Sequence, residues 1–194
     1  LVTPFNFPMA IPTGKMFPAL LYGNAVVIKP AEDVPHTVTV LVELLLEAGL
    51  PPEVIQLVHG LGEEAGAALV QHPNVPLISF TGSTETGRIV GEICGRMHKR
   101  LSLEMGGKNA MIVLNDADLD LALEGVLWGA FGTTGQRCTA TSRLILQDGI
   151  HDAFVSQLAD RVSTLRLGDG RAEGTDVGPL INQAAVEKVE RYID

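Results

Sequence analysis

Cysteine is scarce in this chain of 194 residues, which contains only Cys94 and Cys138. Two cysteines are too few for a disulfide framework, so a free thiol is available as a reactive group. Basic residues are also in the minority, because 14 Lys and Arg face 23 Asp and Glu and leave a formal net charge of −9. The chain therefore lacks the basic face that nucleic acid requires and the polybasic segment that an anionic membrane attracts, and we expect neither partner.

Long hydrophobic runs and common hydrolase or metal motifs are missing as well. The longest uncharged stretch, residues 1–14, is interrupted by three prolines and is too short to span a bilayer. The five histidines include no pair at i and i+4 and no His-Glu-x-x-His motif, so we expect no metal site. No Gly-x-Ser-x-Gly motif occurs, which disfavours a serine hydrolase.

The two ends of the chain carry few boundary signals. The chain starts at Leu1 without Met, a basic segment or a cleavage site, and residues 1–3 are typical of a strand entering a Pro-rich turn. The last predicted helix has no Gly or Pro stop signal. We therefore expect no signal peptide, and a fragment cut from a longer protein.

Short β-branched runs alternate with amphipathic segments along the chain, which predicts an α/β fold with a mainly parallel sheet and right-handed crossovers. The predicted strands are residues 25–29, 54–58, 77–80, 101–104, 110–114 and 142–146. The predicted helices are residues 36–48, 62–71, 84–97, 116–131, 151–165 and 182–194, with a Gly-rich loop at 168–178. The Gly106-Gly107 pair interrupts two apolar runs, so we predict domains at 1–106 and 107–194.

Two glycine loops each follow a predicted strand and open a predicted helix. Gly60, Gly62 and Gly66 form a Gly-x-Gly-x-x-x-Gly pattern, one residue longer than the usual dinucleotide fingerprint, and a simple tight turn explains it equally well. The second loop, residues 82–87, lacks the Lys-Ser/Thr pair of a nucleotide-triphosphate loop, but it offers backbone N–H groups and the Ser83 hydroxyl to a phosphate. Together the loops favour a bound nucleotide.

One cysteine and one glutamate are candidates for chemistry. Cys138 lies in a polar turn beside Arg137, which is able to stabilise a thiolate, although most lone cysteines are buried and inert. Cys94 lies within a predicted helix, and we interpret it as packing. Glu104 ends a strand before the glycine pair, where it can approach a ligand or pair with Lys108 in solvent.

Five short motifs occur in an order that resembles the aldehyde dehydrogenase superfamily over essentially the whole chain. They are Pro4-Phe5-Asn6-Phe7-Pro8, Lys29-Pro30-Ala31-Glu32, Phe80-Thr81-Gly82-Ser83, Glu104-Met105-Gly106-Gly107-Lys108 and Gly135-Gln136-Arg137-Cys138. Family chains are longer, so the resemblance identifies a central part: most of a Rossmann-like NAD-binding domain and the first part of an α/β catalytic domain that carries the nucleophile.

The resemblance implies a covalent mechanism for oxidising an aldehyde to a carboxylic acid. Cys138 matches the nucleophile that forms a thiohemiacetal, and the Asn6 amide and the Cys138 N–H match the oxyanion site. Hydride transfer to nicotinamide leaves a thioester. Glu104 matches the base that activates water to hydrolyse it, and Lys15 matches a lysine that organises Asn6 and Glu104.

The resemblance also implies where the cofactor binds. Lys29 and Glu32 match residues that contact the adenosine ribose, and a carboxylate there repels a 2′-phosphate, so we predict NAD over NADP. The remaining residues predicted to bind the cofactor are Gly62, Gly82, Ser83, Gly87 and Met105.

Two regions of the sequence bear on the choice of substrate. Gly14 stands where many members have a large aromatic residue at the substrate entrance, which predicts a wider entrance. Residues 132–146 are similar to the α-ketoglutaric semialdehyde dehydrogenase group. The resemblance implies a small-molecule aldehyde as substrate and a homodimeric or homotetrameric parent, and a free thiol fits the cytoplasm. The alternative is a catalytically incompetent nucleotide-binding or structural fragment of such an enzyme.

Overall fold

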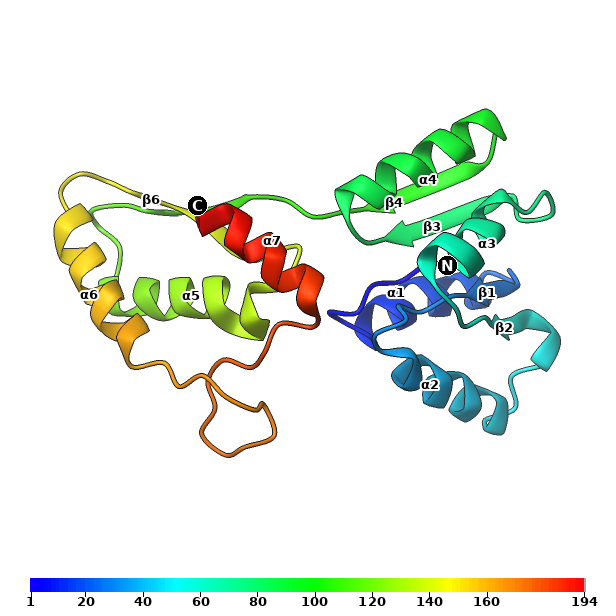
Figure 1. Ribbon diagram of the computed structural model, residues 1–194, viewed down its shortest axis with the longest axis horizontal. Helices are drawn as coiled ribbons and strands as arrows, with labels where there is room; N and C mark the ends of the chain where they lie inside the picture. The colour runs from blue at the N-terminus through cyan, green and yellow to red at the C-terminus, as the bar shows by residue number, and fades with distance from the viewer. Residues whose placement is uncertain (194) are drawn as a thin grey trace. The chain divides into compact units, whose positions relative to one another are not determined.

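The computed structural model describes residues 1–193 and divides into two compact units. The first comprises Leu1–Gly106, and the second begins at Gly107. This division falls at the glycine pair where the sequence pattern predicts a domain boundary. Figure 1 labels the elements of both units.

The first unit alternates strands and helices in the predicted manner. Its strands are β1 (Val26–Ile28), β2 (Ile55–Leu57), β3 (Leu77–Thr81) and β4 (Arg100–Glu104). Its α-helices are α1 (Ala10–Leu21), α2 (Pro35–Glu47), α3 (Ala67–Gln71) and α4 (Thr84–Arg96). The predicted helix 62–71 begins instead as one π-helical segment, η2 (Gly62–Gly66), before α3 continues it, and a short 3-10 turn, η1 (Pro52–Val54), precedes β2.

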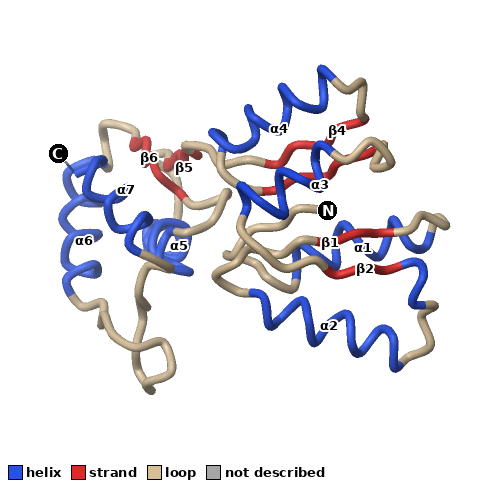
Figure 2. The backbone as a smooth tube through the Cα atoms, turned by 45° about the vertical axis from the view of Figure 1, so that its right-hand side comes forward, coloured by secondary structure: helices blue, strands red, loops and turns tan. Residues whose placement is uncertain are grey.

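The segment Leu1–Thr3 joins the strand pairs of the first unit into one parallel sheet. β1 pairs with β2 and β3 pairs with β4, both in parallel, and Val2 bridges Lys29 on one side and Phe80 on the other. The spatial order is therefore β2, β1, Leu1–Thr3, β3, β4. This is the 3-2-1-4-5 order of a doubly wound dinucleotide-binding fold, so the predicted Rossmann-like class is confirmed (Figure 2).

Two apolar clusters hold helices against this sheet. One packs α1 and α2 against β1 and β2, and its buried members are Met16, Val26, Ile28, Val38, Val42 and Ile55. The other packs α3 and α4 against β3, and its buried members are Val70, Ile78, Phe80, Val90 and Cys94. Each cluster removes apolar side chains from water, which supplies the main driving force for folding.

Helix α1 is an element that the sequence pattern does not predict. Pro12, Gly14 and Pro18 all disfavour a helix interior. Pro12 lies in the first turn, where the missing N–H has no partner within the helix. Met16 is fully buried against β1 and α2, and this packing outweighs the poor local propensity.

The second unit is built around one parallel strand pair. Its elements are β5 (Asn109–Val113), α5 (Leu119–Phe131), a 3-10 turn η3 (Gly132–Gly135), β6 (Thr141–Leu146), α6 (His151–Ser163) and α7 (Gln183–Ile193). Asp118 caps α5 by accepting a hydrogen bond from the N–H of Leu121 at 3.1 Å. The last residue of the predicted helix 182–194 lies outside the described residues.

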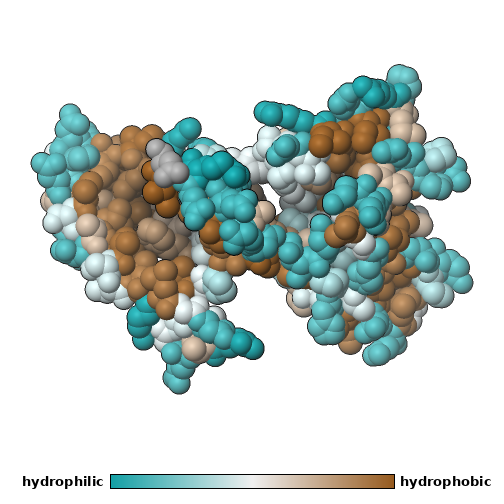
Figure 3. Space-filling model, viewed as in Figure 1, coloured by the Kyte–Doolittle hydropathy of each residue, from teal (hydrophilic) through white to brown (hydrophobic). Residues whose placement is uncertain are grey.

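The strand pair of the second unit is covered on one face only. Val113, Leu144 and Leu146 face the core around Phe154, while Ile112 and Ile145 are 65% and 50% exposed on the other face. Figure 3 shows apolar residues gathered on the surface of this unit. None of the helices within residues 1–193 is long and apolar enough to cross a membrane.

Candidate functional site

The predicted site residues of the first unit gather at one edge of its sheet. All its strands are parallel, so their carboxyl ends share an edge. Asn6 follows the segment Leu1–Thr3, Lys29 follows β1, Gly82 follows β3, and Glu104 ends β4. Motifs up to about a hundred positions apart in the sequence are thereby brought to one side of the unit.

The strand order places a switch point at this edge. From Leu1–Thr3 the chain moves outward to β1 and β2, then returns to β3 on the opposite side of Leu1–Thr3. The connections on the two sides diverge there, and open α/β sheets bind ligands beyond the carboxyl ends of their strands at such a point. Asn6 and Gly82 follow the two strands that flank this point.

Lys29 and Glu32 form a tight ion pair at this edge of the sheet. The Lys29 side chain is 2% exposed, and its Nζ donates to Oε2 of Glu32 at 2.6 Å, while the Glu32 side chain is 41% exposed. Partial burial raises the pKa of Glu32, but the hydrogen bond and charge of Lys29 and the N–H of Gly62 outweigh it and hold that pKa below its ordinary value. The structure thus brings together Lys29, Glu32 and Gly62, three of the residues predicted to bind the cofactor.

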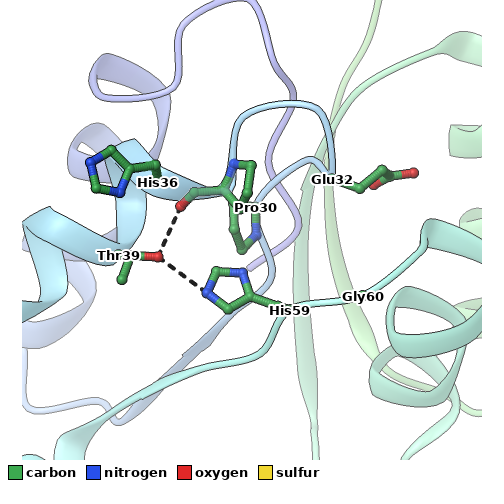
Figure 4. Close-up of a pocket in the computed structure, with 7 residues that line it drawn as sticks. Pro30, Glu32, His36, Thr39, His59 and Gly60 are labelled. Atoms are coloured by element: carbon green, nitrogen blue, oxygen red, sulfur yellow. Dashed lines mark hydrogen bonds between the residues drawn. The ribbon is translucent and has the colours of Figure 1, made fainter.

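A pocket of about 340 Å³ opens beside this ion pair, and Figure 4 shows it. Its lining residues are Pro30, Glu32, Pro35, His36, Thr39, His59 and Gly60. Gly60 has a φ of +141°, and a Cβ there would lie 2.8 Å from the Cβ of Ala65, so the turn requires glycine. Sequence reasoning missed His36, Thr39 and His59, although His59 directly precedes the glycine loop that it singled out.

Ser83 begins α4 as its N-cap. Its Oγ accepts a hydrogen bond from the N–H of Thr86 at 3.0 Å and donates its proton to Thr86 Oγ1 at 2.8 Å. A Ser N-cap is worth about 1 kcal/mol of helix stability. Because the hydroxyl proton is already engaged, the free N–H groups of the first turn of α4 are the donors that remain open to a phosphate.

Gly87 and Met105, both predicted to bind the cofactor, lie against each other. A Cβ at Gly87 would come within 2.4 Å of the Met105 sulfur, so only glycine allows this approach. Met105 packs on the apolar cluster of α3, α4 and β3. The close contact fixes the start of α4 against the chain that leaves β4.

Lys15 reaches from α1 toward β3 and β4. Its Nζ donates to Ser79 Oγ at 2.7 Å. Burial lowers the pKa of Lys15, and the opposing charge of Glu104 raises it by a smaller amount, so the two charged groups are near neighbours. The prediction that Lys15 lies near Glu104 is consistent with this geometry, and Ser79 is a partner that sequence reasoning missed.

Cys138 lies in the second unit on an exposed turn between η3 and β6. Thr133 and Thr134 have φ values of +57° and +56°, which β-branched residues rarely adopt, so the backbone leading to Cys138 is strained. The Asn109 amide clamps the turn by donating to the carbonyl of Cys138 at 2.6 Å and to that of Ala140 at 3.1 Å. Sequence reasoning missed Asn109, although it directly follows the Gly-Gly-Lys motif.

Arg137 does not act as the predicted neighbour of the Cys138 thiol. Its guanidinium donates to the carbonyls of Trp128 and Gly129 at the end of α5, and it stacks on the Trp128 ring at 4.9 Å. The carbonyl end of a helix dipole attracts a cation, which explains the orientation. Cys94 is fully buried, and burial raises the pKa of its thiol, in keeping with a packing role.

No group of three His, Cys, Asp or Glu side chains that is able to hold a metal ion occurs within residues 1–193.

The sequence profile described as the aldehyde dehydrogenase family matches residues 1–194. This chain belongs to the aldehyde dehydrogenase family.

The relatives align with essentially the whole of this chain, but the aligned region is only a part of each relative's length. It is 44% identical over 194 residues to the α-ketoglutaric semialdehyde dehydrogenase of Bacillus subtilis, which is 100% of this chain and 40% of that enzyme. It is 45% identical over 192 residues to the NADP⁺ succinate-semialdehyde dehydrogenase GabD of Escherichia coli, which is 99% of this chain and 40% of that enzyme. The chain thus spans about two fifths of the length of these relatives.

A solved structure of the family superposes closely. The betaine aldehyde dehydrogenase of Staphylococcus aureus, in complex with NAD⁺, matches with a TM-score of 0.96 and 39% identity. The match covers 100% of this chain and 38% of that one.

Proposed function

We propose that this chain carries the NAD-binding and nucleophile-bearing parts of an enzyme that oxidises an aldehyde to a carboxylic acid. The observation that carries the proposal is the gathering of Asn6, Lys29, Gly82 and Glu104 at the carboxyl edge of a sheet with dinucleotide-binding order. Membership of the aldehyde dehydrogenase family supports the reaction type.

The residues at this edge fit an adenine dinucleotide. Glu32 presents a half-exposed carboxylate to the pocket, where it is able to accept hydrogen bonds from ribose hydroxyls and repel a 2′-phosphate. Lys29 holds that carboxylate in place, and the first turn of α4 offers N–H donors for the pyrophosphate. NAD supplies a nicotinamide that accepts hydride, and we propose it over NADP, the cofactor in the name of the GabD relative.

Cys138 and Asn6 take the first chemical roles. The Cys138 thiolate adds to the aldehyde carbon, so that a carbon–sulfur bond forms and the carbonyl electrons move to oxygen. The Asn6 amide and the Cys138 N–H hold the resulting oxyanion. Loss of hydride from this carbon leaves a thioester on Cys138.

Glu104 and Lys15 act in the second stage of the reaction, the hydrolysis of the thioester. Glu104 removes a proton from water, the water oxygen bonds to the thioester carbon, and the carbon–sulfur bond breaks to release the acid and restore the thiolate. Lys15, held by Ser79, positions the Glu104 carboxylate through its charge.

We propose aldehydes that include semialdehydes as substrates, because two relatives are semialdehyde dehydrogenases by name. Gly14 is exposed on α1 with open space beside it, which supports a wide entrance. The parent protein is proposed to be a homodimer or homotetramer. We place it in the cytoplasm, where a nucleophilic thiol stays reduced.

The first test is NADH formation by the full chain with NAD and a panel of short, long and acidic semialdehydes. We expect turnover that Cys138→Ala abolishes and that Thr139→Ala, a control in the same exposed turn, retains. Turnover that survives Cys138→Ala would refute the assigned nucleophile. If neither the wild-type chain nor the control turns over, the incompetent-fragment alternative is favoured, and the longer protein is assayed in the same way.

The role of Glu104 has a distinct kinetic signature. In Glu104→Gln the thioester still forms, so we expect one equivalent of NADH in a burst and a steady-state rate reduced by about 10²–10⁴-fold, the usual contribution of a general base. Rapid-mixing absorbance measures both phases. An equal loss of burst and steady state would assign Glu104 to an earlier step.

A further inference from the structure

A hydrogen-bond chain in the pocket fixes the tautomer of one histidine. A threonine hydroxyl has a single proton, and Thr39 Oγ1 donates it to the carbonyl of Pro35 at 3.0 Å. Thr39 Oγ1 also lies 3.1 Å from Nε2 of His59, so the proton of this second bond must come from the imidazole (Figure 4). Neutral His59 is therefore protonated at Nε2, and its Nδ1 is left as a hydrogen-bond acceptor.

The other charged groups around His59 come from separate elements. Glu32 lines the pocket from the chain after β1 and is paired with Lys29, which emerges from the same strand. His36 lines it from the first turn of α2. Glu63, in the first turn of η2, follows the Gly60 turn but does not line the pocket. With His59 neutral, the pocket thus offers two acceptors, the Glu32 carboxylate and the His59 Nδ1.

We propose that the Thr39–His59 pair is a specificity-determining element that makes the rejection of a 2′-phosphate dependent on pH. This inference rests on the proposed function, because it requires the adenosine end of the dinucleotide to occupy this pocket. With His59 neutral, Nδ1 has no proton to donate and the pocket disfavours a phosphate. With His59 protonated, Nδ1 becomes a cationic donor, offsets the charge of Glu32 and admits the phosphate.

The test is calorimetric titration of the full chain with NAD and with NADP at two pH values. We expect the ratio of their dissociation constants, NADP over NAD, to fall about fivefold from about pH 8 to about pH 5.5. The 2′-phosphate also titrates in this range, so the comparison is made between variants. His59→Gln cannot gain charge and is expected to lose the fivefold change, while His36→Gln, a matched control in the same pocket, keeps it.

Thr39→Val tests the tautomer separately. Valine has the shape of threonine but accepts no hydrogen bond, so the imidazole is free to carry its proton on Nδ1, and we expect weaker discrimination against NADP already at neutral pH. Nitrogen NMR of the His59 ring is expected to show the Nε2–H form in the wild type and a mixture in Thr39→Val. An Nδ1–H form in the wild type would overturn the proposal.

The outcomes separate this inference from the proposed function. If the full chain binds NAD but His59→Gln keeps the same pH dependence as the wild type, or His36→Gln removes it, the inference is wrong and the proposed function stands. If neither dinucleotide binds, both are overturned at this pocket.

Discussion

Replacing Glu32 by Gln takes away the carboxylate that neutralises the buried ammonium of Lys29. That ammonium is 2% exposed and bonds to Glu32 at 2.6 Å. Breaking a fully buried ion pair costs about 3–5 kcal/mol, because the remaining charge stays out of water. Glu32 is 41% exposed, so water can replace part of its effect, and we expect a loss of about 2 kcal/mol in the free energy of unfolding of the first unit.

The reciprocal change has a different result. Lys29→Met removes the buried charge, fills a similar volume and leaves a carboxylate that is already half in water. We expect a loss of less than about 1 kcal/mol, because this variant leaves no uncompensated buried charge, and such a charge is what makes breaking a buried pair costly. The asymmetry between the two variants follows directly from their unequal exposure.

The effect of Glu32→Gln also depends on pH. The pKa of Glu32 lies below its ordinary value in the folded unit, so its stabilising contribution is present above the ordinary glutamate pKa of about 4.3 and is lost as the pH falls further. The difference between Glu32→Gln and the wild type is therefore expected to be full at neutral pH and to shrink in acid.

Amide hydrogen exchange of the β1 strand is the appropriate assay, because the only tryptophan, Trp128, lies in the second unit and does not report on the first. Glu92→Gln is the control, since Glu92 pairs with Arg96 on the surface of α4 with both side chains more than 60% exposed. It is expected to cost no more than about 0.5 kcal/mol. Equal losses for Glu32→Gln and Lys29→Met, or a Glu32→Gln loss no larger than the control, would refute the reasoning.

Two further predictions concern the second unit. Gly125 and Gly129 both lie within α5, but a Cβ at Gly125 meets nothing within 4 Å while one at Gly129 would lie 2.5 Å from Thr141 Oγ1. Gly125→Ala is therefore expected to raise the free energy of unfolding by about 0.5–1 kcal/mol, and Gly129→Ala to lower it by about 1–3 kcal/mol. Urea unfolding followed by Trp fluorescence measures both changes. Equal shifts for the two variants would contradict this. The hydrogen bonds from Arg166 lower the pKa of Asp176 to about 2, so the link between them is expected to persist from neutral pH through pH 4 and to be lost only as the pH nears 2. Carboxyl-carbon NMR of Asp176 measures that titration, and an ordinary aspartate pKa would contradict it.

The strands and the sheet class are predictable from the sequence because buried parallel strands are short β-branched runs between glycine and proline signals. Helix α1 is not predictable in this way, since its stability comes from the packing of Met16 in the core and not from the helix propensity of its residues, which include Pro18. The buried face of α2 is also hard to predict from its sequence: Val38 and Val42 are buried, whereas Leu44 is 56% exposed. A row of adjacent leucines leaves the direction of a helix face ambiguous, and the partner element decides it.

The candidate site also contains residues that the sequence predicts and contacts that it does not. One short motif is enough to single out Lys29 and Glu32 as candidates for binding the cofactor, and the structure shows in addition that these residues, three positions apart, pair with each other. Side-chain direction is not available from neighbours in sequence. Arg137 precedes Cys138 yet points to the end of α5, and Asn109, 29 positions earlier, holds the carbonyl of Cys138 instead. Such partners depend on which strands pair, as β5 and β6 do.

The strand formed by Leu1–Thr3 cannot complete its pairing until much later parts of the chain have been synthesised. Val2 pairs with Lys29 on one side and with Phe80 on the other, and positions 2 and 80 are 78 residues apart. At about 5–20 residues per second, a ribosome adds Phe80 roughly 4–16 s after Val2. During that interval the strand edge that β3 will cover has no partner, and an uncovered edge is a template for pairing with other nascent chains. The speed of translation between these positions therefore sets how long each new chain is exposed to aggregation.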